Sequence, residues 1–209
     1  MTTSPSIPSV GAPDLAARSL HDTVRWLEKA VIGLNLCPFA KGVHVKDQVH
    51  YAVTLTQEPS SLLQLLREEL LALQGTSAEV RDTTLMVAPN CLQDFLDFND
   101  FLNEAEGLLD SLGLGGTLQI ASFHPQFQFA GTDVDDVTNC TNRSPYPTLH
   151  LLREASIDRA VAVFPEAESI FKRNMEVLEA LGMKGWQTLE VGPSGFEQKT
   201  AQTDVENPR

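Results

Sequence analysis

Basic residues are scarce in this chain of 209 residues, which has 15 Lys and Arg against 28 Asp and Glu and a formal net charge of -13. A field of this sign repels the phosphate backbone of nucleic acids, so we expect no nucleic-acid partner. Tryptophan is scarce too: the two residues, Trp26 and Trp186, are too few for a platform on which bases stack.

Cysteines and long apolar runs are also lacking. Cys37, Cys91 and Cys140 are an odd number without paired spacing, so we expect no disulfide framework and a reducing compartment. No run approaches the roughly 20 apolar residues of a membrane-spanning helix, which predicts no membrane association. Residues 1–14 carry neither the basic region nor the apolar region of a secretory signal. A cytoplasmic location is therefore expected, whereas the oligomeric state is not predicted.

Apolar residues make up 42% of the chain, enough for one sizeable core. Apolar periodicity predicts strands over 49–55, 83–88, 117–123 and 186–191, and helices over 13–37, 59–75, 90–113, 146–155, 157–164 and 166–181. Strands separated by helices indicate an α/β fold, with helices packed on a small mixed or parallel sheet. We expect a single domain over 13–191 and polar, flexible tails over 1–12 and 192–209.

The densest polar segment is residues 122–154, which begin where the third predicted strand ends. Ligands in open α/β sheets bind just beyond the carboxyl ends of strands. Within this segment, residues 125–145 are expected to form an ordered loop that is longer than packing requires, and such loops are often functional. The sequence therefore predicts a functional site here.

Three motifs are similar to those of a known family: CPF at Cys37, HPQFQFAG from His124 and NRSPYPTLHLLRE from Asn142. They resemble the bacterial domain-of-unknown-function family 1415, and the resemblance extends from about Leu20 to Val191. It implies a cytosolic bacterial protein. The family has no activity to carry over, so the roles considered below rest on the residues alone.

A divalent metal ion is one candidate cofactor. His124, Asp133 and Asp136, with His150 as a fourth group, offer the imidazole and carboxylate ligands that suit Zn, Mn or Fe. An open coordination position could activate water. Their spacing matches no standard metal motif, however, and aspartates in such a segment equally suit turns and caps.

A small anionic ligand is a second candidate. Ser144 before Pro145 suggests the N-cap of a helix that would carry His150 and Arg153 on one face. The free N–H groups of such a helix start, together with Arg143, could clamp a phosphate or carboxylate. Alternatively, the arginines pair with nearby acids and only brace the loop.

Nucleophilic catalysis by a thiol is a third candidate. Cys37 is expected at the C-terminus of the first helix, where the helix dipole disfavours a thiolate, so a buried structural role fits it better. Cys140 is better placed, with His124 or His150 as its base.

The leading hypothesis is an enzyme of unassigned reaction that acts on a small anionic or phosphorylated ligand. In this hypothesis His124 and His150 exchange protons and Asp136 orients a histidine. The ligand would be held by Asn139, Asn142, Arg143, Ser144 and Arg153. The competing hypothesis is a non-catalytic ligand-binding or protein-interaction module whose polar loop is a structural brace. A shared cleft around these side chains would favour the enzyme, and scattered side chains would count against it.

Overall fold

The first helical segment begins at Leu15 in the computed structural model, which describes residues 15–163 and 169–194 of the chain. Helix α1 (Leu15–Trp26) continues into a π-helix, η1 (Leu27–Ile32). The segment ends before Gly33, short of the predicted end, because the chain turns there and Asn35 adopts a positive φ of 54°. The predicted start at residue 13, the tail over 1–12 and residues 195–209 of the second tail lie outside the described residues.

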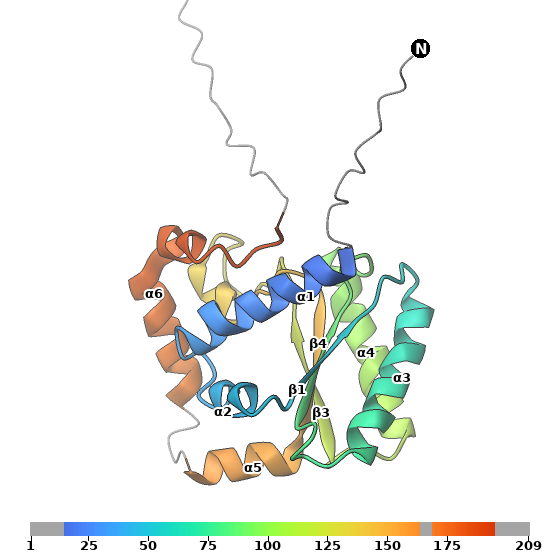
Figure 1. Ribbon diagram of the computed structural model, residues 1–209. Coiled ribbons are helices and arrows are strands. Elements are labelled where there is room, and N and C mark those ends of the chain that lie inside the picture. The colour runs from blue at the N-terminus through green and yellow to red at the C-terminus, as the bar shows by residue number, and fades with distance from the viewer. Residues whose placement is uncertain (1–14, 164–168, 195–209) are drawn as a thin grey trace, which may run out of the picture.

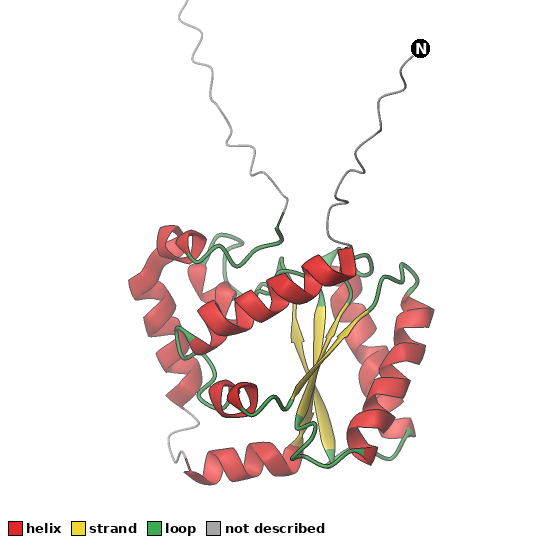
Figure 2. Ribbon diagram, in the orientation of Figure 1, coloured by secondary structure: helices red, strands yellow, loops and turns green. Residues whose placement is uncertain are grey.

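In the described part of the chain, four strands, yellow in Figure 2, form a mixed sheet in the order β1-β2-β4-β3. Strand β1 is parallel to β2, whereas β4 is antiparallel to both of its neighbours, β2 and β3. The strands are β1 (Val49–Val53), β2 (Thr83–Val87), β3 (Leu118–Phe123) and β4 (Thr148–Arg153). The predicted α/β class is confirmed, and the sheet is mixed.

Strand β4 lies where the sequence pattern predicts a helix over 146–155, and that prediction is wrong. Leu149 and Leu151 pack into the core on one face of the sheet, while His150 points to the other, so the pattern has the period of two of a strand. Pro147 also favours an extended conformation for the residue before it. Because β4 pairs on both sides, it is the central antiparallel strand of the sheet.

Helices α3 (Pro59–Gly75) and α4 (Phe95–Ser111) cover one face of the sheet and form the largest apolar core with it (Figure 1). Leu66 and Phe98, almost without exposed surface, lie in this core. Both helices were predicted from their apolar periodicity. Helix α4 begins later than expected, because Asp94 rather than Asn90 caps it by accepting hydrogen bonds from the N–H groups of Leu96 and Asp97, at 2.8 and 3.2 Å.

Among the described residues, α1, η1 and three further helices lie on the other side of the sheet: α2 (Ala40–Val45), α5 (Glu154–Val163) and α6 (Ile170–Thr188). Helix α2 buries none of its residues. The strand predicted over 186–191 is wrong, because α6 continues past a kink at Gly182 to Thr188. None of the described helices is long and apolar enough to cross a membrane.

The last described residues return to α1. The buried carboxylate of Asp22 accepts hydrogen bonds from the backbone N–H of Ser194 and from the phenol of Tyr146, each at 2.8 Å. Arg25, one turn further along α1, donates to the carbonyl of Gly192 at 2.7 Å. Residues far apart in sequence are thereby tied together at one end of the domain.

Candidate functional site

The polar loop is held together by its own side chains. Asn139 is fully buried, and its Oδ1 accepts hydrogen bonds from the N–H of Phe129 and the hydroxyl of Thr132, both at 2.9 Å. Its Nδ2 donates to the carbonyl of Asp133 at 2.9 Å. These bonds cross the loop and use both ends of the amide of Asn139, the predicted ligand-binding residue.

Arg143 and Asp136 also serve the loop. The guanidinium of Arg143 donates to the carbonyls of Phe127 and Val134, at 3.1 and 2.7 Å. Asp136 caps the short 3-10 helix η2 (Val137–Thr141) by accepting bonds from the N–H and hydroxyl of Thr138, at 2.8 and 2.7 Å. These two bonds lower the pKa of Asp136, and the charge of Arg143 adds to the effect.

The predicted anion pocket at a helix start does not exist, because Ser144 precedes strand β4 instead of a helix. The Ser144 hydroxyl is buried and donates to the carbonyl of Tyr146 at 2.6 Å. The Asn142 amide donates to the carbonyl of Ser122 at 3.3 Å, which ties the loop to the end of β3. Both predicted ligand residues therefore contact backbone.

Arg153 ends β4 and closes the C-terminus of α3. Its guanidinium donates to the carbonyls of Leu73 and Thr76, each at 2.5 Å, and to that of Arg81 at 3.1 Å. Carbonyls at a helix C-terminus lack partners within the helix, so a cation is favoured there. Arg153, which was predicted to bind an anion, thus donates its hydrogen bonds to backbone carbonyls of the protein.

His124 packs against α4, with its ring centre 5.0 Å from that of Phe98. Its Nδ1 accepts a hydrogen bond from the N–H of Gln126 at 3.0 Å, so Nε2 carries the proton and donates to the carbonyl of Leu92 at 3.1 Å. Both ring nitrogens are used, and burial lowers the pKa of His124. No lone pair remains for a metal ion or for proton transfer.

His124, Asp136, Arg143 and His150 therefore do not point into one cleft. Within residues 15–163 and 169–194, no group of three or more His, Cys, Asp or Glu side chains is placed to hold a metal ion. The set predicted from His124, Asp133 and Asp136 is not assembled. Of the predicted proton-transfer residues, His150 lines a cavity that the other two do not line.

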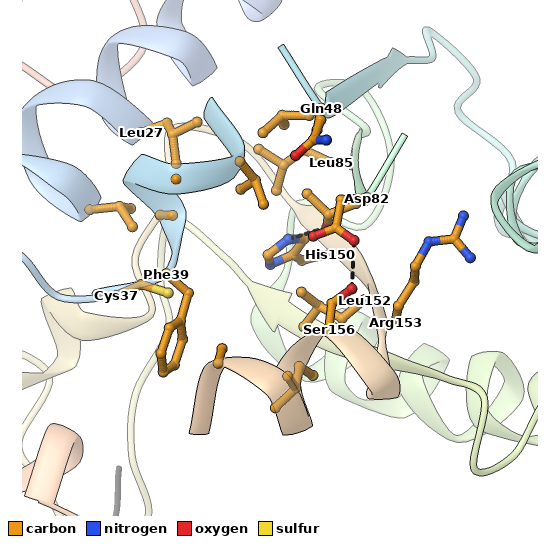
Figure 3. Close-up of a pocket in the computed structure, with 18 of the residues that line it drawn as sticks. Leu27, Cys37, Phe39, Gln48, Asp82, Leu85, His150, Leu152, Arg153 and Ser156 are labelled. Atoms are coloured by element: carbon orange, nitrogen blue, oxygen red, sulfur yellow. Dashed lines mark hydrogen bonds between the residues drawn. The ribbon is translucent and has the colours of Figure 1, made fainter. Parts of the chain in front are cut away.

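That cavity has a volume of about 690 Å³ and lies on the face of the sheet opposite α3 and α4 (Figure 3). Its floor is formed by outward-facing strand residues, among them Leu85, Ala121 and His150. Leu85 and Ala121 are the direct strand partners of His150. The walls come from α1, η1, α2 and α5. The volume suits a small organic molecule.

The hydroxyl of Thr83 determines which nitrogen of His150 carries the proton. It lies 2.7 Å from the carbonyl of Leu151 and 2.7 Å from Nε2 of His150. A carbonyl only accepts, so the single hydroxyl proton of Thr83 goes to Leu151, and Nε2–H of His150 donates to Thr83. In the neutral ring Nδ1 is then left with a lone pair, and no donor in the described part of the chain bonds to it.

Burial lowers the pKa of His150 from its ordinary value of 6.5 to about 4. The ring is therefore neutral at physiological pH and acts as a hydrogen-bond acceptor.

One family model matches residues 18–188; its description is "Protein of unknown function (DUF1415)". The chain belongs to this family. The resemblance predicted from the CPF, HPQFQFAG and NRSPYPTLHLLRE motifs is confirmed. No curated protein and no solved structure matches the chain.

Cys37 lines the cavity of this DUF1415 domain, on the side of α2 (Figure 3). It lies five residues beyond the end of η1, so the expected position at a helix C-terminus is wrong. Burial raises the pKa of its thiol, although hydrogen bonds from the backbone N–H groups of Phe39 and Ala40 oppose the shift. Burial likewise raises the pKa of Cys140 to about 11. Both thiols are protonated at neutral pH and are poor nucleophiles.

The cavity of the DUF1415 domain has a polar end opposite Cys37, near the start of α5. Ser156 donates to Oδ1 of Asp82 at 2.5 Å and accepts a hydrogen bond from Arg159 at 2.9 Å. Gln48 donates its amide N–H to the carbonyl of Glu79 at 3.1 Å. Figure 3 shows Leu27 and Cys37 on one side of His150, and Asp82 and Ser156 on the other.

Sequence reasoning missed Thr83, Asp82 and Ser156 as site residues. Thr83 stands in an apolar strand, where a β-branched residue is ordinary. Asp82 and Ser156 belong to no recognisable motif. The register that pairs β2 with β4 brings Thr83 to His150, and that register is not visible in either strand alone.

Proposed function

We propose that this DUF1415 domain binds a small, largely apolar organic molecule in the cavity beside His150. The observation that carries the proposal is a neutral, oriented imidazole on the floor of a cavity of about 690 Å³. Ligand sites are typically mainly apolar, with a few placed polar groups that fix orientation. Trp26, Leu27 and Phe123 supply an apolar wall, and Nδ1 of His150 supplies the orienting acceptor.

Binding is better supported than proton-transfer catalysis. A general base works best when its pKa lies near the operating pH, and a pKa of about 4 makes His150 a weak base. The neighbouring thiol of Cys37 is protonated and so is not a ready nucleophile. The hypothesis of an enzyme for an anionic ligand has lost the support of Arg143 and Arg153, whose guanidinium groups donate to backbone carbonyls.

Naphthol tests the proposal, because it has an apolar two-ring body and one O–H group that can donate to Nδ1 of His150. The variant Ala121→Leu adds bulk to the cavity floor beside His150. The control Gln119→Leu changes the same strand and the same face two residues earlier, outside the cavity lining. Calorimetric titration should show saturable naphthol binding, weakened about tenfold or more by Ala121→Leu and unchanged by Gln119→Leu.

A second variant, His150→Phe, removes the acceptor but keeps an apolar ring. We expect it to weaken naphthol binding about tenfold. Absence of saturable binding to the wild-type protein, or equal effects of Ala121→Leu and Gln119→Leu, would contradict the proposal.

A further inference from the structure

Several hydrogen-bond donors that line the cavity near His150 already have partners within the protein. The hydroxyl of Thr83 donates to Leu151, and that of Ser156 donates to Asp82. The amide of Gln48 donates to Glu79, and Arg153 donates to three backbone carbonyls. The hydroxyl protons of Thr83 and Ser156 are therefore not available to a ligand in this region.

Hydrogen-bond acceptors in the same region are left over. Nδ1 of His150, Oδ2 of Asp82 and Oε1 of Gln48 have no donor among the described residues, whereas the other polar atoms of these three side chains are bonded. All three residues line the cavity. A partly buried acceptor without a donor is favourable only when water or a ligand supplies one.

We infer that the cavity takes an amine: a protonated amino group at the end formed by Asp82 and His150, joined to an apolar body that lies against Trp26 and Leu27. The inference rests on the proposed function, since it names the class of ligand for the same cavity. An ammonium group has three donors and no acceptor, which complements the leftover acceptors of His150, Asp82 and Gln48. Its charge also pairs with the carboxylate of Asp82.

Cations near the cavity do not reverse this preference. Arg153 holds its guanidinium on the backbone beside α3, and Figure 3 shows the group extending away from His150. Lys46 and Arg159 are exposed at the edge of the cavity, where solvent and salt screen their charges. Glu79 is exposed in the same way, so Asp82, which is half-buried, is the charged group nearest the polar end of the lining. The net charge of -13 also attracts cations from solution.

The same arrangement disfavours an anion. A carboxylate ligand at this end would face the carboxylate of Asp82 and the lone pair of His150, whereas the guanidinium of Arg153 is directed away from His150 toward backbone carbonyls. The electrostatic difference between an ammonium and a carboxylate is therefore the clearest signature of the site.

Three probes with one apolar body test the inference: naphthylethylamine, naphthylethanol and naphthylacetate. Calorimetric titration of the full chain at neutral pH should give affinities in that order, with the amine bound about tenfold or more tightly than the carboxylate. Equal or tighter binding of naphthylacetate would overturn the inference on the wild-type protein alone, without any variant.

The variant Asp82→Asn removes the charge at the polar end. It should weaken amine binding about tenfold and leave naphthylethanol binding within about twofold. Asp158→Asn is the matched control: it makes the same change in net charge at an exposed position of α5 outside the cavity lining. Equal losses of amine affinity in the two variants would assign the preference to overall charge and overturn the role of Asp82.

The outcomes separate this inference from the proposed function. If none of the three probes and no naphthol binds, the cavity is not a ligand site and the proposed function fails. If the alcohol binds and the amine has no advantage over it, the cavity remains a ligand site and only the amine inference fails.

Discussion

The hydroxyl of Thr83 on β2 lies 2.7 Å from Nε2 of His150 on β4, two antiparallel neighbours in the sheet. Because the same hydroxyl donates to the carbonyl of Leu151, Thr83 can only accept from His150. One hydroxyl group thus keeps the imidazole in the Nε2–H form and leaves Nδ1 for the cavity.

Replacing Thr83 by valine should remove both hydrogen bonds of the Thr83 hydroxyl and with them the preference for one tautomer of His150. The Nε2–H of His150 loses its acceptor and the carbonyl of Leu151 loses its donor, so we expect a loss of about 2 kcal/mol in the free energy of unfolding. Nitrogen NMR of the imidazole should show the Nε2–H tautomer in the wild type and a mixture in the variant. Thr148→Val, which removes a hydroxyl that donates to Tyr146, is the control and should leave the tautomer unchanged.

Acid should destabilise the protein partly through His150. Its folded pKa of about 4 lies below its ordinary value of 6.5, so between these values the unfolded chain binds more protons. Stability is therefore fully present above about pH 6.5 and falls as the pH drops toward 4, by about 2 kcal/mol between pH 7 and 4.5 from this group.

Urea denaturation at several pH values measures this contribution. His150→Gln should show a shallower loss of stability on acidification than the wild type. His50 and His124, whose pKa values burial also lowers, remain in both proteins and provide the common background. Identical pH dependence in the two proteins would contradict the assignment to His150.

The polar loop should matter for stability and not for ligand affinity. Asn139→Ala removes three hydrogen bonds and leaves the N–H of Phe129 without its acceptor, so we expect a loss of about 3 kcal/mol in the free energy of unfolding. Asn103→Ala, at an exposed position of α4, should change it by less than about 0.5 kcal/mol. Naphthol affinity of folded Asn139→Ala should match that of the wild type; a selective loss of affinity would restore the loop as a ligand site.

Cys37 should react slowly with iodoacetamide. Burial raises the pKa of its thiol, so little thiolate is present at neutral pH and the rate should fall below that of free cysteine. Mass spectrometry of the modified peptide measures the rate of alkylation. Bound naphthol should reduce this rate further, because Cys37 lines the cavity that naphthol would fill. Reaction as fast as that of free cysteine would show that the thiol is activated.

Much of the fold follows from local pattern. Helix α3 runs from Pro59 to Gly75 as its breakers indicate, and the first three strands lie within two residues of their predicted bounds. Strand β4 was not predicted because a segment as short as Leu149–Leu152, with one alternation of apolar and polar residues, does not distinguish a strand from a helix. Pairing with β2 and β3 determines that this segment is a strand, and at least β2 is remote from it in sequence.

The site was predictable only in part. His150 was named, but with partners from its own segment, whereas its hydrogen-bond partner Thr83 comes from another strand. Asn139 and Arg143 are predicted as ligand residues because polar side chains in a long loop are typical of a binding site. Their actual partners are mostly backbone groups of that loop, and composition does not distinguish a backbone partner from a ligand.

Hydrogen bonds tie Ser194 and Gly192 to α1, so the two described ends of the domain lie close together. The same fold can therefore form from a chain whose segments follow one another in a different order. Ser194 contacts Asp22, which lies about 10 Å along the helix from Leu15, and Figure 1 shows both described ends on the same side of the domain. A glycine linker can therefore join residue 194 to residue 15, with new termini opened at the exposed turn of Gly115 and Gly116. Such a circular permutant would retain every strand pairing and place β3 at the start of the polypeptide.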